Sequence, residues 1–275
     1  MSVIAMTREM GSGSREVAQR VADRMGLTVI LHELVEHVVA EHMHVPDSAV
    51  HHLLEGRATL RERWQIGSKR LARYTTEEIL EIAKQGNVLI RGWGACVILR
   101  EVPHVARIRI CTPMEVREQA VMERSGLTDR SAARLEIERN DAAHKRSLHA
   151  VYGVDREDPL LYDLVLNTDR NSIETCVKLV CDLVDSPELQ ETDFSRAILH
   201  DKVLEAHIRV KLRERFIVGT GVSGVEATVD GGKVLLSGTA IHSALVADAC
   251  KIVSEVAGVK EVVNRMTVVH GRAGL

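Results

Sequence analysis

Short apolar runs alternate with longer segments of helical hydrophobic spacing along the N-terminal part of the chain. An apolar run at Ser2–Thr7 precedes a Gly-Ser-rich loop, and a second short run lies at Thr28–Ile30. Between them, Arg15–Met25 carries apolar residues at the spacing of one helix face. A strand, a tight loop, a helix and a second strand in close succession are typical of a βαβ unit.

The same alternation continues to about residue 185. Residues 32 to 85 have helical spacing with a break at Pro46, and a helix start is indicated at Thr112, which is followed by Pro113 and Glu115. Further strands and a last helix are predicted at Val88–Ile90, Val105–Cys111, Leu164–Leu166 and Ile173–Val184. The pattern predicts an α/β fold with a parallel sheet covered by helices on both faces.

A change of pattern after Pro187 predicts a second domain. Residues 186–200 begin polar and show no clear period, so they are interpreted as a linker between domains at 1–185 and 201–270. The second domain has the predicted order α-β-β-α-β, which fits a small α+β sandwich. Its elements are expected at Asp201–Arg215, Val225–Val229, Lys233–Leu236, His242–Val256 and Glu261–Val269, with a hairpin signal at Asp230-Gly231-Gly232.

Composition excludes several classes of protein. With 45% hydrophobic and 27% charged residues, the chain is that of an ordinary globular protein. A net charge of −3 and an aromatic content of 3% argue against nucleic-acid binding. No apolar run is long enough to span a membrane. The cysteine count of five is odd, and no export signal is recognisable, so we expect reduced thiols and a cytoplasmic location.

The loop after the first strand carries the strongest chemical motif, Thr7-Arg8-Glu9-Met10-Gly11-Ser12-Gly13-Ser14-Arg15-Glu16. Backbone N–H groups of Gly11, Ser12, Gly13 and Ser14 would point into one cavity at a helix N-terminus, which favours a bound phosphate. Arg15 would supply the cation. The strict P-loop pattern places Gly, Lys and Ser/Thr where this chain has Ser14, Arg15 and Glu16. Glu16 could help to hold Mg²⁺. A βα turn without a ligand is the alternative.

Four segments in order resemble the cytidylate kinase-like family of P-loop kinases. They are the loop with its helix, Val88–Ala95, Arg107–Arg117 and Asp158–Thr168, and together they cover about residues 1–185. The resemblance implies a P-loop kinase-type parallel sheet with a helical lid. It also implies ATP and Mg²⁺ as cofactors and a nucleoside monophosphate, CMP or dCMP above all, as phosphate acceptor.

The resemblance also assigns roles to charged residues outside the loop. Arg139 and Arg146 match arginines of the family's lid, and Asp141 matches a lid carboxylate. Arg117 matches an arginine of a family helix, and a solvated helix charge is the alternative. Arg91 is the candidate replacement for a family arginine whose position is Trp93 in this chain. Arg91, Arg117 and Asp141 are thus the candidate acceptor-binding residues.

Several departures affect the chemistry that the resemblance implies. They are Ser14, Glu16, Trp93, Ala142 and His144, and Lys145 is a candidate to compensate for one missing lid arginine. These departures support a second hypothesis, in which the domain senses a nucleotide without phosphoryl transfer and regulates what the second domain binds.

Six histidines fall between residues 32 and 52: His32, His37, His42, His44, His51 and His52. A metal site needs ligands that converge on one point, and His37 and His42 do not have the i, i+4 spacing of a helical zinc site. The interpretation is therefore solvated histidines, with no metal held by protein ligands alone.

The second domain resembles the BON domain, a small module of bacterial envelope and stress proteins. The matching stretches are Val229–Thr239 and Val256–Asn264. The resemblance implies a non-catalytic module whose partner is a phospholipid, an envelope component or another ligand. Docking of this module to an anionic membrane surface is a third hypothesis.

Two features of this domain have simple interpretations. The glycine-rich stretch Gly219–Gly224 lacks a following lysine and is predicted to be a flexible connection. Basic residues crowd the end of the preceding helix, where they interact favourably with its dipole; an anionic partner is the alternative. They are Arg209, Lys211, Arg213 and Arg215.

Overall fold

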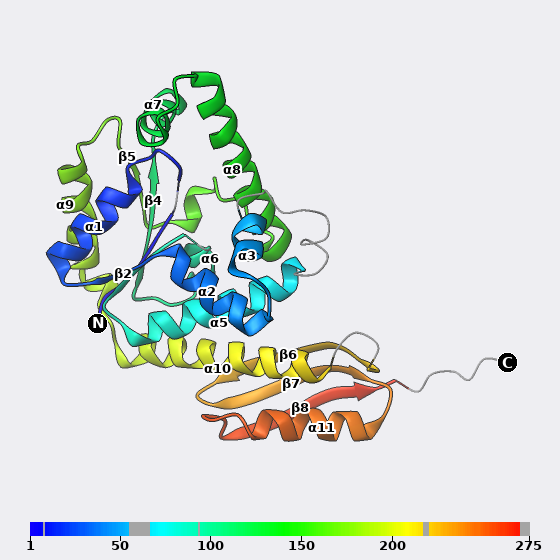
Figure 1. Cartoon of the computed structure of the whole chain (residues 1–275). Helices are drawn as coiled ribbons and strands as arrows, with labels where there is room; N and C mark the ends of the chain where they lie inside the picture. The colour runs from blue at the N-terminus through cyan, green and yellow to red at the C-terminus, as the bar shows by residue number, and fades with distance from the viewer. Residues whose placement is uncertain (8, 55–66, 93, 217–219, 270–275) are drawn as a thin grey trace. The chain divides into compact units, whose positions relative to one another are not determined.

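The computed structural model of the chain describes residues 1–7, 9–54, 67–92, 94–216 and 220–269 (Figure 1). These residues form two compact units, Met1–Thr192 and Asp193–Leu275. Trp93 and Gly219, which were singled out in the sequence, lie outside the described residues.

The first unit is built on a five-stranded parallel sheet with the order β2-β3-β1-β4-β5. The strands are β1 (Val3–Met6), β2 (Thr28–Ile30), β3 (Val88–Arg91), β4 (Val105–Cys111) and β5 (Leu164–Asn167). All five strands predicted from the apolar runs are present, and the predicted fold class is confirmed. Strand β1 lies between β3 and β4, and all four of its residues are buried.

Helices cover both faces of this sheet (Figure 1). One face packs against α1 (Ser14–Met25) and α9 (Ile173–Val184), which share a core with Ile4, Ile108 and their neighbours. The other face carries α5 (Ser68–Gln85) and α6 (Ala95–Ile98). Short 3-10 turns lie at η1 (Pro159–Leu161) and η2 (Pro187–Leu189).

Two helices form a hairpin between β4 and β5. Helix α7 (Met114–Ser125) follows β4 and α8 (Arg130–Tyr152) returns toward the sheet (Figure 1). The hairpin has a small core of its own around Val121, Ala133 and Ile137. The Asp129 side chain accepts a hydrogen bond from the backbone N–H of Ser131 and so caps α8. This hairpin occupies the place of the predicted lid.

Helices α2 (His32–Met43) and α3 (Asp47–Leu54) contain most of the clustered histidines. Nδ1 of His37 lies 2.9 Å from Oδ2 of Asp47, and Nδ1 of His51 lies 3.0 Å from Oε2 of Glu36, so each pair joins α2 to α3. In the part of the chain that the structure describes, three or more potential ligands gather nowhere as they would around a metal ion.

The second unit has the predicted order: α10 (Asp193–Arg215), β6 (Val222–Asp230), β7 (Lys233–Ala240), α11 (Ser243–Ser254) and β8 (Glu261–Val268). Strand β7 lies in the centre, antiparallel to β6 and parallel to β8. Residues of both helices share a core with the sheet, including Leu204, Ile208 and Ala249. No helix among the described residues is apolar over a length that would cross a membrane.

The structure differs from the sequence interpretation at the start of β6. The predicted connection over 219–224 is wrong for residues 222–224, which belong to the strand. Val222 pairs with Ala240, and a bulge between Ser223 and Glu226 accommodates Gly224, whose φ is 59°.

Helix α10 begins at Asp193, inside the segment 186–200 that was interpreted as a linker. Ser195, Leu199 and Val203 are buried at a spacing of four residues, so the helical period extends further toward the N-terminus than the polar composition suggested.

The basic residues at the end of α10 are partly paired. Arg209 bonds to Glu205 and Arg215 to Asp248, whereas Lys211 and Arg213 are exposed.

The contact between α2 and α3 predicts a pH dependence. The hydrogen bond and charge of Asp47 raise the pKa of His37 above its ordinary value of 6.5, with a smaller effect from Glu41. Because the folded-state pKa is raised, this pair stabilises the unit fully below pH 6.5, and its contribution is lost as the pH rises through the folded pKa. NMR titration of the His37 ring in the full chain should give a pKa above 6.5 that falls in Asp47→Asn. Asp169→Asn, an exposed control, should leave it unchanged.

Candidate functional site

The loop Glu9–Gly13 lies beyond the carboxyl end of the central strand, between β1 and α1. Arg8 of the quoted motif lies outside the described residues. In sheet order, β1 and β4 are neighbours. The connection after β1 runs to β2 at one edge of the sheet, whereas the connection after β4 runs to β5 at the other edge. Ligands of open α/β sheets bind outside the carboxyl ends of the strands at such a switch point. The sheet therefore places the predicted phosphate loop at the edge where open α/β sheets bind ligands.

Two glycines allow the shape of this loop. Gly11 and Gly13 have φ values of 77° and 73°, a conformation that other residues adopt only at a cost. A Cβ atom on Gly11 would lie 2.6 Å from the carbonyl oxygen of Arg117, so the loop and the start of α7 touch through backbone. Gly13 is the N-cap of α1 and is exposed. The positive end of the α1 dipole therefore faces the loop.

Side-chain hydroxyls hold the loop in place. Oγ of Ser12 donates to the carbonyl oxygen of Glu9 at 2.8 Å, and Oγ1 of Thr168, just after β5, donates to the carbonyl oxygen of Ser12 at 2.9 Å. Ser12 and Ser14 are buried, so these residues stabilise the loop from the side that faces the protein interior.

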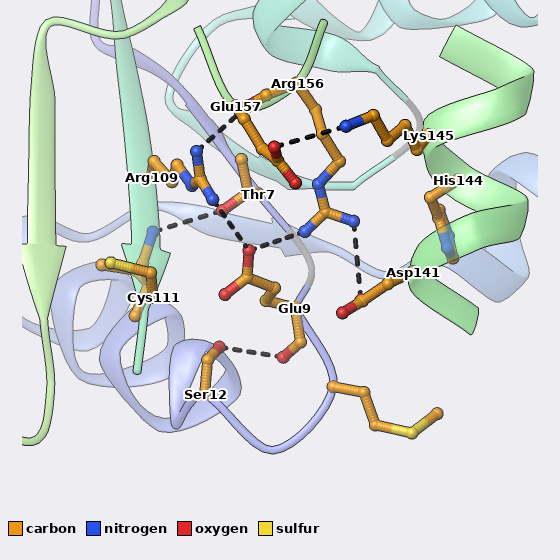
Figure 2. A network of polar contacts seen from close by, with 12 residues as sticks. Thr7, Glu9, Ser12, Arg109, Cys111, Asp141, His144, Lys145, Arg156 and Glu157 are labelled. Atoms are coloured by element: carbon orange, nitrogen blue, oxygen red, sulfur yellow. Dashed lines mark hydrogen bonds and ion pairs between the residues drawn. The ribbon is translucent and has the colours of Figure 1, made fainter. Parts of the chain in front are cut away.

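A buried carboxylate of the loop is paired with two arginines (Figure 2). Oε1 of Glu9 accepts a hydrogen bond from Nη2 of Arg156 at 2.6 Å and a longer one from Nη2 of Arg109 at 3.4 Å. The Glu9 side chain is only 5% exposed. Buried charges of this kind are stable only when paired, so Glu9 fixes both guanidinium groups beside the loop.

A second carboxylate, Asp141 of α8, extends this network to the lid. It accepts two hydrogen bonds from Arg117, from Nη1 to Oδ2 at 2.7 Å and from Nη2 to Oδ1 at 3.0 Å. Nε of Arg117 donates to the carbonyl oxygen of Met10 at 2.7 Å. Nη1 of Arg156 lies 3.6 Å from Oδ1 of Asp141. The loop, α7, α8 and the segment after α8 are thus joined by one set of charges.

Tyr162 completes the support of Arg156. Its hydroxyl donates to the carbonyl oxygen of Arg156 at 2.7 Å, and Nη1 of Arg109 donates to the same oxygen at 3.2 Å. The Arg109 guanidinium also lies over the Tyr162 ring. Burial raises the pKa of Tyr162 to about 12, so its hydroxyl keeps its proton at neutral pH.

The structure brings some of the predicted site residues together and leaves others apart. Arg117 and Asp141 bond to each other beside the loop. Arg91 is buried and is the register partner of Met6, close to where the loop begins. The predicted cations are all exposed and do not join the Glu9–Asp141 network; they are Arg15, Arg139 and Arg146.

Three further residues have partners of their own. The Glu16 carboxylate accepts a hydrogen bond from Arg20 one turn along α1. Lys145, the candidate substitute for a lid arginine, pairs with Glu157 at 3.3 Å and Asp155 at 3.6 Å, and the hydrogen bond to Glu157 raises its pKa. Nδ1 of His144 contacts the carbonyl oxygen of Asn140.

Sequence reasoning missed Glu9, Arg109, Arg156 and Tyr162. Glu9 stands in the quoted loop motif, and an acidic residue facing a phosphate loop implies a nearby cation. Its partners lie 100 and 147 residues further along the chain, so no local spacing identifies them.

The residues fit a phosphate group better than a metal held by protein alone. The loop offers the N-terminus of α1, and three arginines lie against it. Of the four backbone donors predicted to face a phosphate, the N–H of Ser12 bonds to the Glu9 carbonyl at 3.2 Å and that of Ser14 to Oγ of Ser12 at 3.4 Å. Mg²⁺ in such sites is held largely by phosphates and water. Oε1 of Glu16 is paired with Arg20, and the carboxylate is about half exposed.

Comparison with known families decides the assignment. The model of the cytidylate kinase-like family matches residues 3–170, which is more than half of the chain. The chain belongs to the cytidylate kinase-like family. The model of the BON domain matches residues 200–270, so the second unit is a BON domain.

Named relatives of this cytidylate kinase-like chain agree with the match. A cytidylate kinase of Pyrobaculum aerophilum is 27% identical over 66% of this chain and 92% of its own length. A cytidylate kinase of Pyrococcus horikoshii is 26% identical over 66% of this chain and 88% of its own length. The crystal structure of an uncharacterized protein from Eubacterium ventriosum covers 67% of this chain and 98% of its own, with a TM-score of 0.53 and 20% identity.

The contact at Gly11 predicts that adding a side chain at this position destabilises the cytidylate kinase-like unit. Gly11→Ala introduces a Cβ in a left-handed conformation and against the Arg117 backbone, so we expect a loss of roughly 2 kcal/mol or more in the free energy of unfolding. Gly126→Ala, at a C-cap of positive φ with open space around it, should cost about 1 kcal/mol. Chemical denaturation of the two variants tests this difference, and equal losses would show that the close approach is unimportant.

Proposed function

We propose that the first unit transfers the γ-phosphoryl group of ATP to a nucleoside monophosphate, with CMP or dCMP as the acceptor. The observation that carries this proposal is the glycine loop at the α1 N-terminus, joined through Glu9 to arginines near the lid hairpin. The relatives that are named cytidylate kinase support the choice of acceptor.

Each residue has a physical role in this reaction. Gly11, Ser12, Gly13 and Ser14 present the loop backbone to the phosphates of ATP, which supplies the phosphoryl group together with Mg²⁺. Arg15, at the first turn of α1 and exposed, serves as the cation of the loop. The transition state carries charge on the phosphoryl oxygens, so catalysis depends on positioned cations more than on covalent chemistry.

The lid would supply further cations when it closes. Arg139 and Arg146 lie on α8 and are exposed, so they are accessible to a ligand without breaking the Glu9–Asp141 network. Nε of Arg146 donates to the carbonyl oxygen of Ala142, one turn earlier in the same helix. Lid closure in kinases of this type excludes water from the reacting phosphate.

A second candidate function is a nucleotide sensor without turnover. It is favoured by the ion pairs of Arg117 with Asp141 and of Glu16 with Arg20, because they occupy side chains that the kinase hypothesis assigns to the acceptor and to Mg²⁺. In this alternative, nucleotide binding in the first unit regulates what the BON domain binds, for which a phospholipid or an envelope component is proposed.

A direct assay separates these functions. The full chain is incubated with ATP, Mg²⁺ and each of CMP, dCMP, UMP, AMP and GMP, and diphosphate products are measured. Formation of CDP or dCDP supports the kinase. ATP binding without any diphosphate product supports the sensor and contradicts the kinase.

Substitution of Arg15 tests the role of the loop. Arg15→Ala should lower kcat by about 100-fold, because one cation aimed at the developing charge is removed. Arg24→Ala, at the other end of α1, is the matched control and should change kcat by less than about twofold. An active protein in which Arg15→Ala behaves as Arg24→Ala would show that Arg15 does not contact the phosphates.

A further inference from the structure

Three arginines and two carboxylates form one connected set beside the phosphate loop: Arg109, Arg117 and Arg156 with Glu9 and Asp141. The set carries one excess positive charge in a largely buried place. An uncompensated buried charge is unfavourable in water-poor surroundings, and a bound anion removes the penalty. The excess charge therefore points to an anionic ligand at this position.

The three arginines differ in how far their donors are used. Arg117 donates from Nε, Nη1 and Nη2 to Met10 and Asp141. Arg109 donates from both terminal nitrogens, to Arg156 and Glu9, and its buried Nε has no hydrogen-bond partner among the described residues. Arg156 makes one hydrogen bond from its guanidinium to the described residues, that from Nη2 to Glu9. Its Nη1 lies only within ion-pair distance of Asp141.

Arg156 is nevertheless held firmly. Its side chain is 10% exposed, and its carbonyl oxygen accepts hydrogen bonds from Arg109 and from the Tyr162 hydroxyl. The preceding residue is fixed too, because Oδ1 of Asp155 accepts a hydrogen bond from the backbone N–H of Glu157. A guanidinium with a fixed base and unused donors is prepared for bidentate binding of phosphate.

We propose that Arg156 is a phosphate-binding residue of the nucleotide site and that Glu9 is the positioning residue that directs it toward the loop (Figure 2). The ligand is the polyphosphate chain of a nucleoside triphosphate, bound by Arg156 while its bond to Glu9 persists. This inference rests on the proposed function, since it assigns the nucleotide phosphates to the Glu9–Gly13 loop.

The test compares binding of two probes, MgATP and inorganic tripolyphosphate, to the full chain by calorimetry. Arg156→Gln should weaken both by about 10- to 100-fold, the effect of losing charge-assisted hydrogen bonds. Arg124→Gln removes an exposed arginine at the end of α7 and should change both affinities by less than about twofold.

A double variant separates binding from folding. Arg156→Gln alone removes the strongest partner of the Glu9 carboxylate, so it should also lower the Tm. Glu9→Gln with Arg156→Gln keeps the net charge of the set and replaces the ion pair by two amides. This double variant should recover most of the Tm and none of the lost affinity. Recovery of both would show that Arg156 is only structural and would overturn the proposal.

The remaining outcomes distinguish this inference from the proposed function. If the wild-type chain transfers phosphate and Arg156→Gln binds both probes as tightly as wild type, the inference fails and the kinase stands. If affinity depends on Arg156 and no acceptor is phosphorylated, the inference stands and the kinase fails. A wild-type chain that binds neither probe overturns both.

Discussion

The need to pair one buried carboxylate organises the candidate site. Glu9 is carried into the interior by the turn that follows the central strand, where water cannot solvate its charge. Arg156 and Arg109 meet that requirement, and each belongs to a different part of the first unit, the segment after α8 and strand β4. Removing one partner from a buried pair typically costs about 3–5 kcal/mol, so the interaction ties these parts firmly together.

The same set of charges explains why the loop and the lid hairpin are coupled. Asp141 bonds to Arg117, and Arg117 bonds to the Met10 carbonyl of the loop. Gly11 makes this possible, because only a residue without a side chain lets the loop touch the backbone of α7. A displacement of the hairpin must therefore either move the loop or break charged hydrogen bonds. Geometry at the phosphate site and the position of α8 are not independent.

The local hydrophobic pattern of the sequence was sufficient to predict the architecture of the first unit, but it was not sufficient to predict the charged residues of the candidate site. The five strands of the first unit are short apolar runs bounded by turn residues, so the local pattern of apolar residues locates them. The loop is recognisable from its glycines. The Glu9–Arg156 pair spans 147 residues and depends on how the strands are ordered, which hydrophobic spacing does not encode. The start of β6 was missed for a different reason: a bulge lets glycine occupy a strand where its conformational freedom predicts a connection.

The strand order also has a consequence for the nascent chain on the ribosome. Strand β1 is made first, yet its two neighbours begin at Val88 and Val105. The loop that follows β1 therefore leaves the ribosome long before the sheet that shapes it. Its charge stays without a partner until Arg109 and Arg156 have been synthesised, and Thr168 follows later still. A translation product that ends before Arg109 contains the complete glycine motif and the Ser12 hydroxyl that bonds within it, but none of the later side chains that hold the loop from outside.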